Sequence, residues 1–250
     1  MKSLYIFFLL HITLFATIDI APVDIGAKKG LHSSVAASLS TNRGNTDKDQ
    51  YSATLKSTYD NAKTYVFWAE ASFKYGQANA ELNEQKAYVH ARYIHGITSK
   101  EFCFELFSQV ESDRFKDINN KILSGGGIRW NFFKAQSGLG KAYLGLGTYN
   151  EYITYIDSNL NPNENNWRLN SYLAYTKKLG ADSKFNFTTY YQPLARFVND
   201  YYLSALMELQ LHIYLELYLS FKVEYDYDSK PPIGVKKEDF YQLTSFIYHF

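Results

Sequence analysis

Apolar and polar residues alternate one by one along most of the chain. In the longest such row, every second residue from 215 to 227 is leucine, phenylalanine, valine or tyrosine, and the residues between are mostly polar. Similar rows occupy alternate positions of 65–75, 102–110 and 167–175. Successive side chains of a β-strand point to opposite faces, whereas those of a helix do not. This period of two therefore predicts strands with one apolar face and one polar face.

Breaks at turn-forming residues divide the chain into twelve such segments. The predicted strands are 31–41, 50–60, 63–76, 82–95, 100–112, 118–133, 139–155, 165–178, 183–193, 199–210, 213–228 and 237–250. An even number places both chain ends on one side of an up-and-down barrel, as in bacterial outer-membrane barrels. Connections after odd-numbered strands are generally the longer ones, which is typical of outer loops as opposed to periplasmic turns. The sequence therefore predicts an all-β fold, an antiparallel up-and-down transmembrane β-barrel of about twelve strands.

The inward face of the predicted barrel carries nearly equal numbers of basic and acidic residues. The candidate lumen-lining residues are Glu70, Lys74, Glu84, Lys86, His90, Arg92, Glu105, Arg129, Arg168, Glu216 and Lys222. A pore selective for ions of one sign carries an excess of the opposite charge. Near balance instead favours ion pairs across the interior, and the inward positions of Val66, Trp68, Phe107 and Leu123 favour packing. We expect a narrow or filled lumen.

The composition agrees with a barrel and excludes several kinds of site. Aromatic residues form 18% of the chain, and those near strand ends, such as Tyr59, Tyr65 and Tyr93, are expected to form girdles at the membrane interfaces. With 26 basic and 25 acidic residues the net charge is +1, and no basic stripe indicates nucleic acid as a partner. Cys103 is the single cysteine, so an internal disulfide is excluded.

Residues 1–21 have the features of a signal peptide. Lys2 precedes an apolar stretch, 4–16, that is too short to cross a bilayer as a helix. Ala16 and Ala21 are both candidate cleavage positions, and the alternative is a retained N-terminal anchor. We expect the leader to carry the chain across the inner membrane of a Gram-negative bacterium, with 22–250 forming a single domain in the outer membrane.

No recognised catalytic, cofactor or metal motif occurs in the sequence. None of the six histidines lies in a Gly-x-Ser-x-Gly or His-Glu-x-x-His setting. His90, Arg92, Glu84 and Glu105 are expected to form a buried polar cluster with a structural role. Gly125–Gly127 lacks the helix and lysine of a phosphate loop, and indicates a place where the wall bends or strands approach closely. We therefore expect neither an enzyme nor a bound cofactor.

Segments at both ends of the chain resemble one family. Residues 38–46, Ser-Leu-Ser-Thr-Asn-Arg-Gly-Asn-Thr, are similar to the serine-rich first strand and Gly-Asn-Thr turn of the salt-induced outer membrane protein family. Residues 225–239 resemble its final outer loop, in which a tyrosine-rich strand precedes Pro-Pro, a glycine and Lys-Lys. Gly125–Gly127 is similar to its glycine-rich middle, while Asn42-Arg43 departs from the small residue expected there. The resemblance spans about residues 35–250, implies an outer-membrane β-barrel, and transfers no catalytic residue.

Three functions remain open at this point. The first is a structural or stress-associated barrel with a filled lumen, the second is a small porin-like diffusion channel, and the third is an outer-membrane lipid hydrolase. The expected partners are outer-membrane lipid and lipopolysaccharide, together with the barrel-assembly machinery, because Phe250 ends an aromatic row that resembles the signal this machinery reads. Leu217→Arg is expected to block assembly if Leu217 faces lipid at the midplane.

Overall fold

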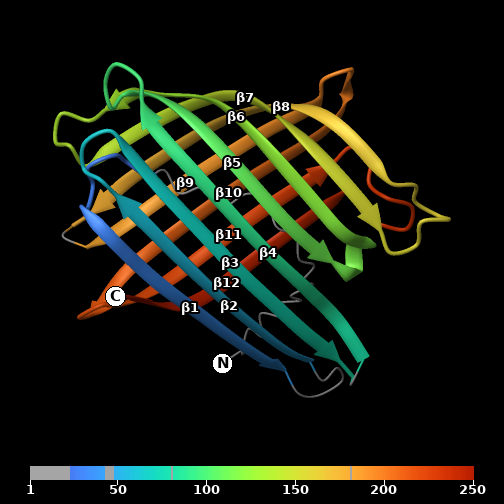
Figure 1. Ribbon diagram of the computed structural model, residues 1–250. Coiled ribbons are helices and arrows are strands. Elements are labelled where there is room, and N and C mark those ends of the chain that lie inside the picture. Colours follow the sequence, from blue (N-terminus) through green and yellow to red (C-terminus); the bar gives the residue numbers. More distant parts are fainter. Residues whose placement is uncertain (1–22, 43–47, 80, 181) are drawn as a thin grey trace, which may run out of the picture.

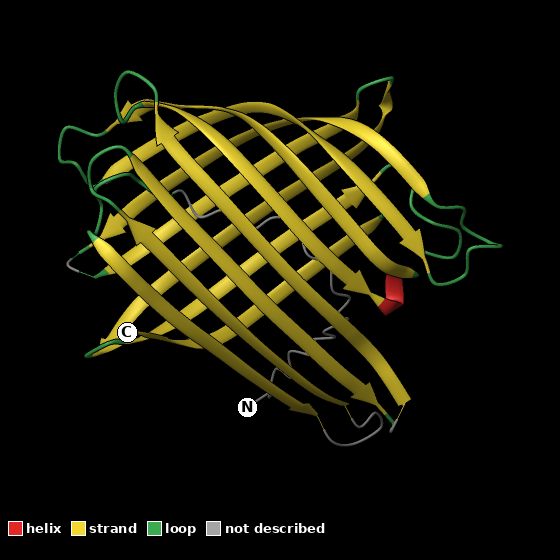
Figure 2. Cartoon of the chain, in the orientation of Figure 1, coloured by secondary structure: helices red, strands yellow, loops and turns green. Residues whose placement is uncertain are grey.

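A computed structural model describes residues 23–42, 48–79, 81–180 and 182–250, so the predicted leader, 1–21, lies outside the described residues. Nearly all of the described chain is strand, with one short 3₁₀ helix, η1 (Arg114–Lys116) (Figure 2). The strands are β1 (Gly30–Asn42), β2 (Lys48–Asp60), β3 (Tyr65–Ala78), β4 (Glu81–Gly96), β5 (Phe102–Asp113), β6 (Ile118–Lys134), β7 (Gly140–Tyr155), β8 (Glu164–Leu179), β9 (Ser183–Leu194), β10 (Phe197–Tyr214), β11 (Leu217–Asp228) and β12 (Glu238–His249).

The twelve strands form one closed antiparallel barrel (Figure 1). Each strand pairs with the next along the chain, and β12 pairs with β1 to close the ring. The closing contact is short, running from Ser34↔His249 to Ala37↔Phe246, whereas β1 and β2 pair along the full length of both strands. The structure confirms the all-β fold, the up-and-down order and the even strand number.

Strand boundaries agree closely with the prediction except between β10 and β11. The sequence predicts a turn at 211–212, but β10 continues to Tyr214 and the chain turns at Leu215 and Glu216. Leu215 has a φ of 48°, a left-handed conformation that is rare for a leucine. The apolar row runs through this turn without a break, so the hydrophobic pattern contains no signal for it.

The two ends of the barrel differ in their connections. Gly30 and Phe250 lie at one end, here called the terminal end, and the opposite end is called the loop end (Figure 1). The two longest connections, 156–163 and 229–237, both lie at the loop end. Connections 79–80 and 195–196, also at the loop end, are as short as the tightest turns at the terminal end, because the strands extend further than predicted. The predicted difference in length therefore holds for only part of the loop end.

The outer wall of the barrel is apolar and exposed. Leu106, Leu146 and Leu169 are examples of large hydrophobic side chains that point away from the interior. A soluble protein seldom leaves so much apolar surface in contact with water, whereas a membrane barrel presents such a band to lipid. Within the described residues no helix is long and apolar enough to cross a membrane. The outward wall is that of a transmembrane β-barrel of the outer-membrane type.

Aromatic rings gather near both ends of this wall. At the terminal end, the ring centroid of Tyr65 lies 6.1 Å from that of Tyr59 and 5.5 Å from that of Tyr93. Near the loop end, Tyr201 and Tyr227 lie 5.7 Å apart. Aromatic side chains prefer the boundary between hydrocarbon and water because one part of the ring is apolar and the other is polar. The two groups mark where the wall meets the two membrane surfaces.

Candidate functional site

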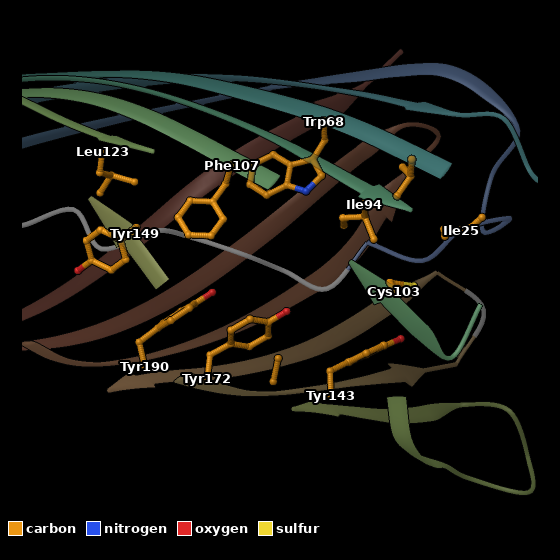
Figure 3. Packing of buried hydrophobic residues seen from close by; sticks show 12 residues of the cluster. Ile25, Trp68, Ile94, Cys103, Phe107, Leu123, Tyr143, Tyr149, Tyr172 and Tyr190 are labelled. Carbon is orange, nitrogen blue, oxygen red and sulfur yellow. The ribbon is translucent and has the colours of Figure 1, made fainter. Parts of the chain in front are cut away.

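The interior of the barrel is the candidate site, because charged and aromatic side chains meet there. Trp68 on β3 and Phe107 on β5 face Tyr172 on β8 and Tyr190 on β9 across the lumen (Figure 3). All four side chains are buried. Together with His90, Arg92, Glu105 and Tyr149 they form what we call the central layer. The inward apolar residues that the sequence predicts are therefore part of a packed interior.

Stacked rings form one half of the central layer. The His90 ring stacks on Trp68 at 4.8 Å between centroids and on Phe107 at 6.4 Å. The Arg92 guanidinium lies 4.9 Å from the Phe107 ring centroid, within the range of a cation–π contact. Each of these side chains comes from an inward position of β3, β4 or β5. Their packing fills the lumen beside that part of the wall.

Glu105 joins this half to the opposite wall. Its carboxylate accepts a hydrogen bond from Arg92 at 3.2 Å and from the Tyr172 hydroxyl at 2.7 Å. It also lies 3.5 Å from the Arg129 guanidinium. One buried carboxylate thus contacts two buried guanidinium groups, from β4 and β6, and a phenol from β8. The Oε1 atom of Glu105 and three guanidinium nitrogens of Arg92 and Arg129 have no hydrogen-bond partner, so charge pairing is the main interaction that joins these groups.

Two further charge networks lie nearer the loop end. Glu151 binds Arg168 and lies 3.3 Å from the Lys121 ammonium. Arg168 also donates to Asp200 at 2.9 Å, and its guanidinium lies 3.8 Å from the Tyr202 ring centroid. These contacts join side chains of β6, β7, β8 and β10, which lie close together in the order of the wall.

The third network is centred on Lys86. Its ammonium lies 2.9 Å from Glu111 and 3.4 Å from Asp113, and all three side chains are buried. Pairing of this kind reduces the cost of holding charges away from water. The near balance of inward charge that the sequence shows is therefore used in ion pairs between neighbouring strands.

Glycines on β6 and β7 make room for the central layer. A Cβ at Gly145 would lie 1.9 Å from a ring carbon of Tyr172, and a Cβ at Gly127 would lie 2.8 Å from the Cα of Gly147. Both distances are shorter than real contacts allow. Gly125–Gly127 therefore marks a close approach of strands, as the sequence predicts.

Two cavities lie on either side of the central layer. The loop-end cavity has a volume of about 230 Å³ and is lined by Lys121, Arg168 and the proline pair of the last loop. The terminal cavity has a volume of about 440 Å³ and is lined by Lys56, Lys222 and small residues of β1 and β2. Among the described residues, the two cavities share no lining residue.

Loops cover the loop-end cavity. The backbone N–H of Ile233, in connection 229–237, donates to the Asn161 side chain at 2.9 Å. Asn161 in turn donates to Asp117 at 2.8 Å, and Asp117 also accepts from the N–H of Asp157 at 3.0 Å. These bonds join the two longest connections to each other above the lumen.

A short segment before β1 enters the lumen from the terminal end. The Asp24 carboxylate binds the Lys141 ammonium and the Tyr143 hydroxyl. Arg129 donates to the carbonyl of Val23 at 3.0 Å, and Ile25 is buried in the same apolar cluster as the central layer. Sequence analysis missed these contacts, because residues 23–29 show no strand period. The signal present in the sequence was an acidic residue, Asp24, shortly before the first strand, together with an inward lysine, Lys141, that could pair with it.

The structure places most of the candidate lumen residues inside the barrel. The buried ones are Glu70, Glu84, Lys86, His90, Arg92, Glu105, Arg129 and Arg168. Lys74 and Lys222 are partly buried at inward positions. Glu216 is a correction, because it lies exposed in the turn between β10 and β11 and not on an inward strand face.

The expected cluster around His90 also differs from the prediction. Arg92 and Glu105 do meet, but the His90 ring forms a hydrogen bond with Gln109, at 3.4 Å, and stacks on Trp68 and Phe107. Glu84 lies further toward the loop end, where it accepts from Gln50 at 2.9 Å. Alternation assigns a side chain to the inner face but does not give its neighbours on other strands.

The described ranges contain no group of three or more histidine, cysteine, aspartate or glutamate side chains placed to hold a metal ion. The side chains of His32 and His212 bind backbone carbonyls, and that of His95 binds a tyrosine hydroxyl.

Comparison with known proteins identifies a family and several similar structures. A family model described as "Protein of unknown function, DUF481" matches residues 35–250. A search of curated proteins found no match. Similar solved structures include a KdgM porin, at 12% identity and a TM-score of 0.47, covering 88% of this chain and 99% of the porin. Others are a NanC porin (14% identity, TM-score 0.46, 87% and 97% covered) and the translocator domain of the autotransporter NalP from Neisseria meningitidis (9% identity, TM-score 0.49, 89% and 88% covered).

Proposed function

The chain belongs to the DUF481 family, whose function is unknown, and from this premise we propose that it is an outer-membrane β-barrel closed to free diffusion at mid-height. Its role is structural or stress-associated. The central layer carries this proposal. Rings and ion pairs from β3 to β9 meet across the lumen there, and the two cavities lie on opposite sides of it.

The proposal includes an orientation. The terminal end faces the periplasm and the loop end faces outward, because the longest connections lie at the loop end and outer loops are generally the longer ones. Export through the inner membrane depends on the leader at 1–21. The barrel-assembly machinery inserts the chain by reading the terminal row that ends at Phe250, and outer-membrane lipid and lipopolysaccharide surround the finished wall.

The proposal also excludes catalysis. A lipid hydrolase requires a serine and a histidine within hydrogen-bond reach at the lipid boundary. The His95 side chain forms a hydrogen bond with the Tyr93 hydroxyl, and the His212 side chain forms one with the backbone carbonyl of Leu215. Neither contact activates a nucleophile. Hydrolysis of a lipid ester by the purified barrel would contradict this part of the proposal.

Single-channel conductance tests whether the lumen is closed. The wild-type barrel, folded into a planar bilayer and shown to be heat-modifiable on a gel, is expected to give no discrete conductance steps. Trp68→Ala combined with Phe107→Ala removes two rings of the central layer and is expected to open steps that scale with salt concentration. Trp167→Ala, which removes an exposed ring on the outer wall, is the matched control and is expected to stay silent.

Discrete steps in the wild type would overturn the closed lumen and favour the diffusion channel. Silence in the double variant, despite correct folding, would show that the central layer is not what closes the barrel.

The association with salt stress is a separate part of the proposal. It depends on the sequence resemblance at 38–46 and 225–239. Expression of the protein is expected to rise when the growth medium is changed from low to high sodium chloride, and to stay constant in sucrose of equal osmolarity if the signal is ionic. Unchanged expression in both media would contradict the association.

A further inference from the structure

The seam between β1 and β12 is hydrogen-bonded over only part of its length. Ser33 and Phe250 exchange backbone hydrogen bonds of 2.8 and 2.9 Å at the terminal end. Pairing continues to Ala37↔Phe246 and then stops, although both strands extend further. Beyond that pair, no further residues of β1 and β12 are paired in register in the described part of the chain, while each strand stays paired with its other neighbour. The seam is therefore open toward the loop end.

The outward row of β12 becomes polar beside the unpaired part of the seam. Along the outward row of β12, Phe240 and Phe246 flank Gln242 and Thr244, and all four side chains are exposed. Unpaired backbone groups are costly in hydrocarbon, so membrane walls normally leave none. Polar side chains and water can satisfy such groups. Two polar residues beside an unpaired edge therefore indicate a hydrated break in the wall.

The terminal cavity lies directly behind this break. Its lining includes Ala36 of β1 together with Leu243 and Ser245, which belong to the unpaired part of β12. Ala37, from the outward row of β1, also lines the cavity. The cavity therefore reaches the wall at the seam. The central layer is built from β3 to β9 on the other side of the barrel, so it does not block this approach.

Two lysines of the terminal cavity lie on the strands next to the seam, at different heights. Lys56 on β2 pairs in register with Ser34, in the paired part of the seam, and Lys222 on β11 pairs with Leu243, in its open part. Both line the terminal cavity and keep 23% and 19% of their side-chain surface exposed. Their distances to Glu70 and Glu224 are 3.8 and 3.7 Å, longer than the 2.9 Å between Lys86 and Glu111.

The cavity as a whole has more positive than negative side chains. Its lysines are Lys56, Lys141, Lys178, Lys184 and Lys222, and its carboxylates are Asp24, Glu70 and Glu208. The apolar part of its lining includes Leu243 and Ile247. A cavity that has an excess of lysines and reaches the wall at the seam matches a ligand with an acidic head and an apolar chain.

We propose that the barrel binds a single-chain anionic amphiphile, with its acidic head group among the lysines of the terminal cavity, nearest Lys222, and its apolar chain passing through the open β1–β12 seam. The proposal rests on the membrane-spanning part of the proposed function and is independent of the closed lumen. The route through the seam does not pass through the central layer, so the ligand can enter from the membrane while the lumen is closed.

Photo-crosslinking in phosphatidylcholine vesicles tests the proposal. The probe is hexadecanoate with a diazirine on its chain, and labelled peptides are identified by mass spectrometry. Labelling is expected to concentrate on residues 38–42 and 240–246. Lys56→Gln with Lys222→Gln is expected to reduce it about tenfold, while Lys237→Gln, an exposed lysine outside both cavities, leaves it unchanged.

Closing the seam gives a second, independent variant. Continuing the register beyond Ala37↔Phe246 places Leu39 opposite Thr244, so Leu39→Cys with Thr244→Cys, in a Cys103→Ala background, is designed to form a disulfide there. The oxidised barrel is expected to lose labelling, and reduction is expected to restore it. If this disulfide does not form, the lysine variants still decide the question.

Other probes separate the head group from the chain. Excess butanoate, which has the acid without the long chain, is expected to compete weakly, and hexadecanol labelled in the same way is expected to be captured poorly. Equal capture of hexadecanol, labelling spread evenly over the outer wall, or full competition by butanoate would each overturn the proposal. So would a change of oligomeric state on closing the seam without loss of labelling, since the edge would then be a strand-pairing surface. Conductance is measured separately, so an open channel would contradict the closed lumen and not this inference.

Discussion

The ring of Tyr172 lies directly against Gly145 on the inner wall of the barrel. A Cβ at Gly145 would fall 1.9 Å from the Cε1 atom of that ring, and the same tyrosine donates to Glu105 at 2.7 Å. The two residues also face each other in register on β7 and β8. The absence of a side chain at one position therefore allows the ring at the other to reach the central layer.

Gly145→Ala is expected to destabilise the folded barrel by about 1 to 3 kcal/mol, because the new methyl group displaces the Tyr172 ring. Urea unfolding in detergent, followed by gel mobility, measures the change. In a Tyr172→Ala background the clash is absent, so the cost of Gly145→Ala should largely disappear. Equal costs in the two backgrounds would show that the ring is not the group displaced.

Removing the shared carboxylate is expected to have a larger effect. Glu105→Gln leaves the buried guanidinium groups of Arg92 and Arg129 without their counter-charge and is expected to cost about 3 to 5 kcal/mol. Glu216→Gln is the matched control, since Glu216 is exposed in a turn and its substitution should stay within about 0.5 kcal/mol. Similar unfolding midpoints for the two variants would argue against the network around Glu105.

The outer wall yields a prediction that depends on depth. Leu146 lies near the middle of β7 and is exposed, so Leu146→Arg is expected to cost about 2 to 4 kcal/mol. Leu217 is the first residue of β11, directly after a turn, so Leu217→Arg is expected to cost only about 0 to 1 kcal/mol and to assemble. The expectation from sequence placed Leu217 at the midplane, whereas the structure places it at the start of β11. Folding yield into vesicles compares the two variants.

The stability of the folded barrel is expected to depend on pH through Lys116, which lies in η1 outside the strands. Burial, followed by repulsion from Lys86, lowers the pKa of Lys116 from 10.5 to about 8. Between these two values the unfolded chain binds more protons at this site than the folded barrel, so this contribution to stability rises with pH from about 8 to 10.5.

The comparison with Lys116→Met isolates that contribution. The free energy of unfolding of the wild type, measured between pH 7 and 10.5, should increase relative to that of the variant, and the difference should be constant below pH 8. Parallel profiles over the whole range would mean that the lysine titrates equally in both states.

The strand pattern could be predicted because each β-strand residue faces one of only two sides. Leu106 and Leu169 were assigned outward and Glu105 and Arg129 inward from position alone, and the structure places them so. The same rule failed at Glu216, since an alternating row that continues through a tight turn looks like one long strand. Hydrophobicity reports which side a residue faces and contains nothing about a left-handed φ at Leu215.

The amino-acid sequence by itself determined the closed, twelve-stranded architecture and which face of the wall is apolar and which is polar. Lipid outside and a polar lumen inside impose a period of two on every strand. Only the tertiary structure decided which inward groups meet. Arg92, Glu105 and Tyr172 come from β4, β5 and β8, and their contact depends on register, tilt and barrel width together. The partly unpaired seam between β1 and β12 was likewise decided by closure, since the alternation of a strand does not state where its pairing with a distant strand ends.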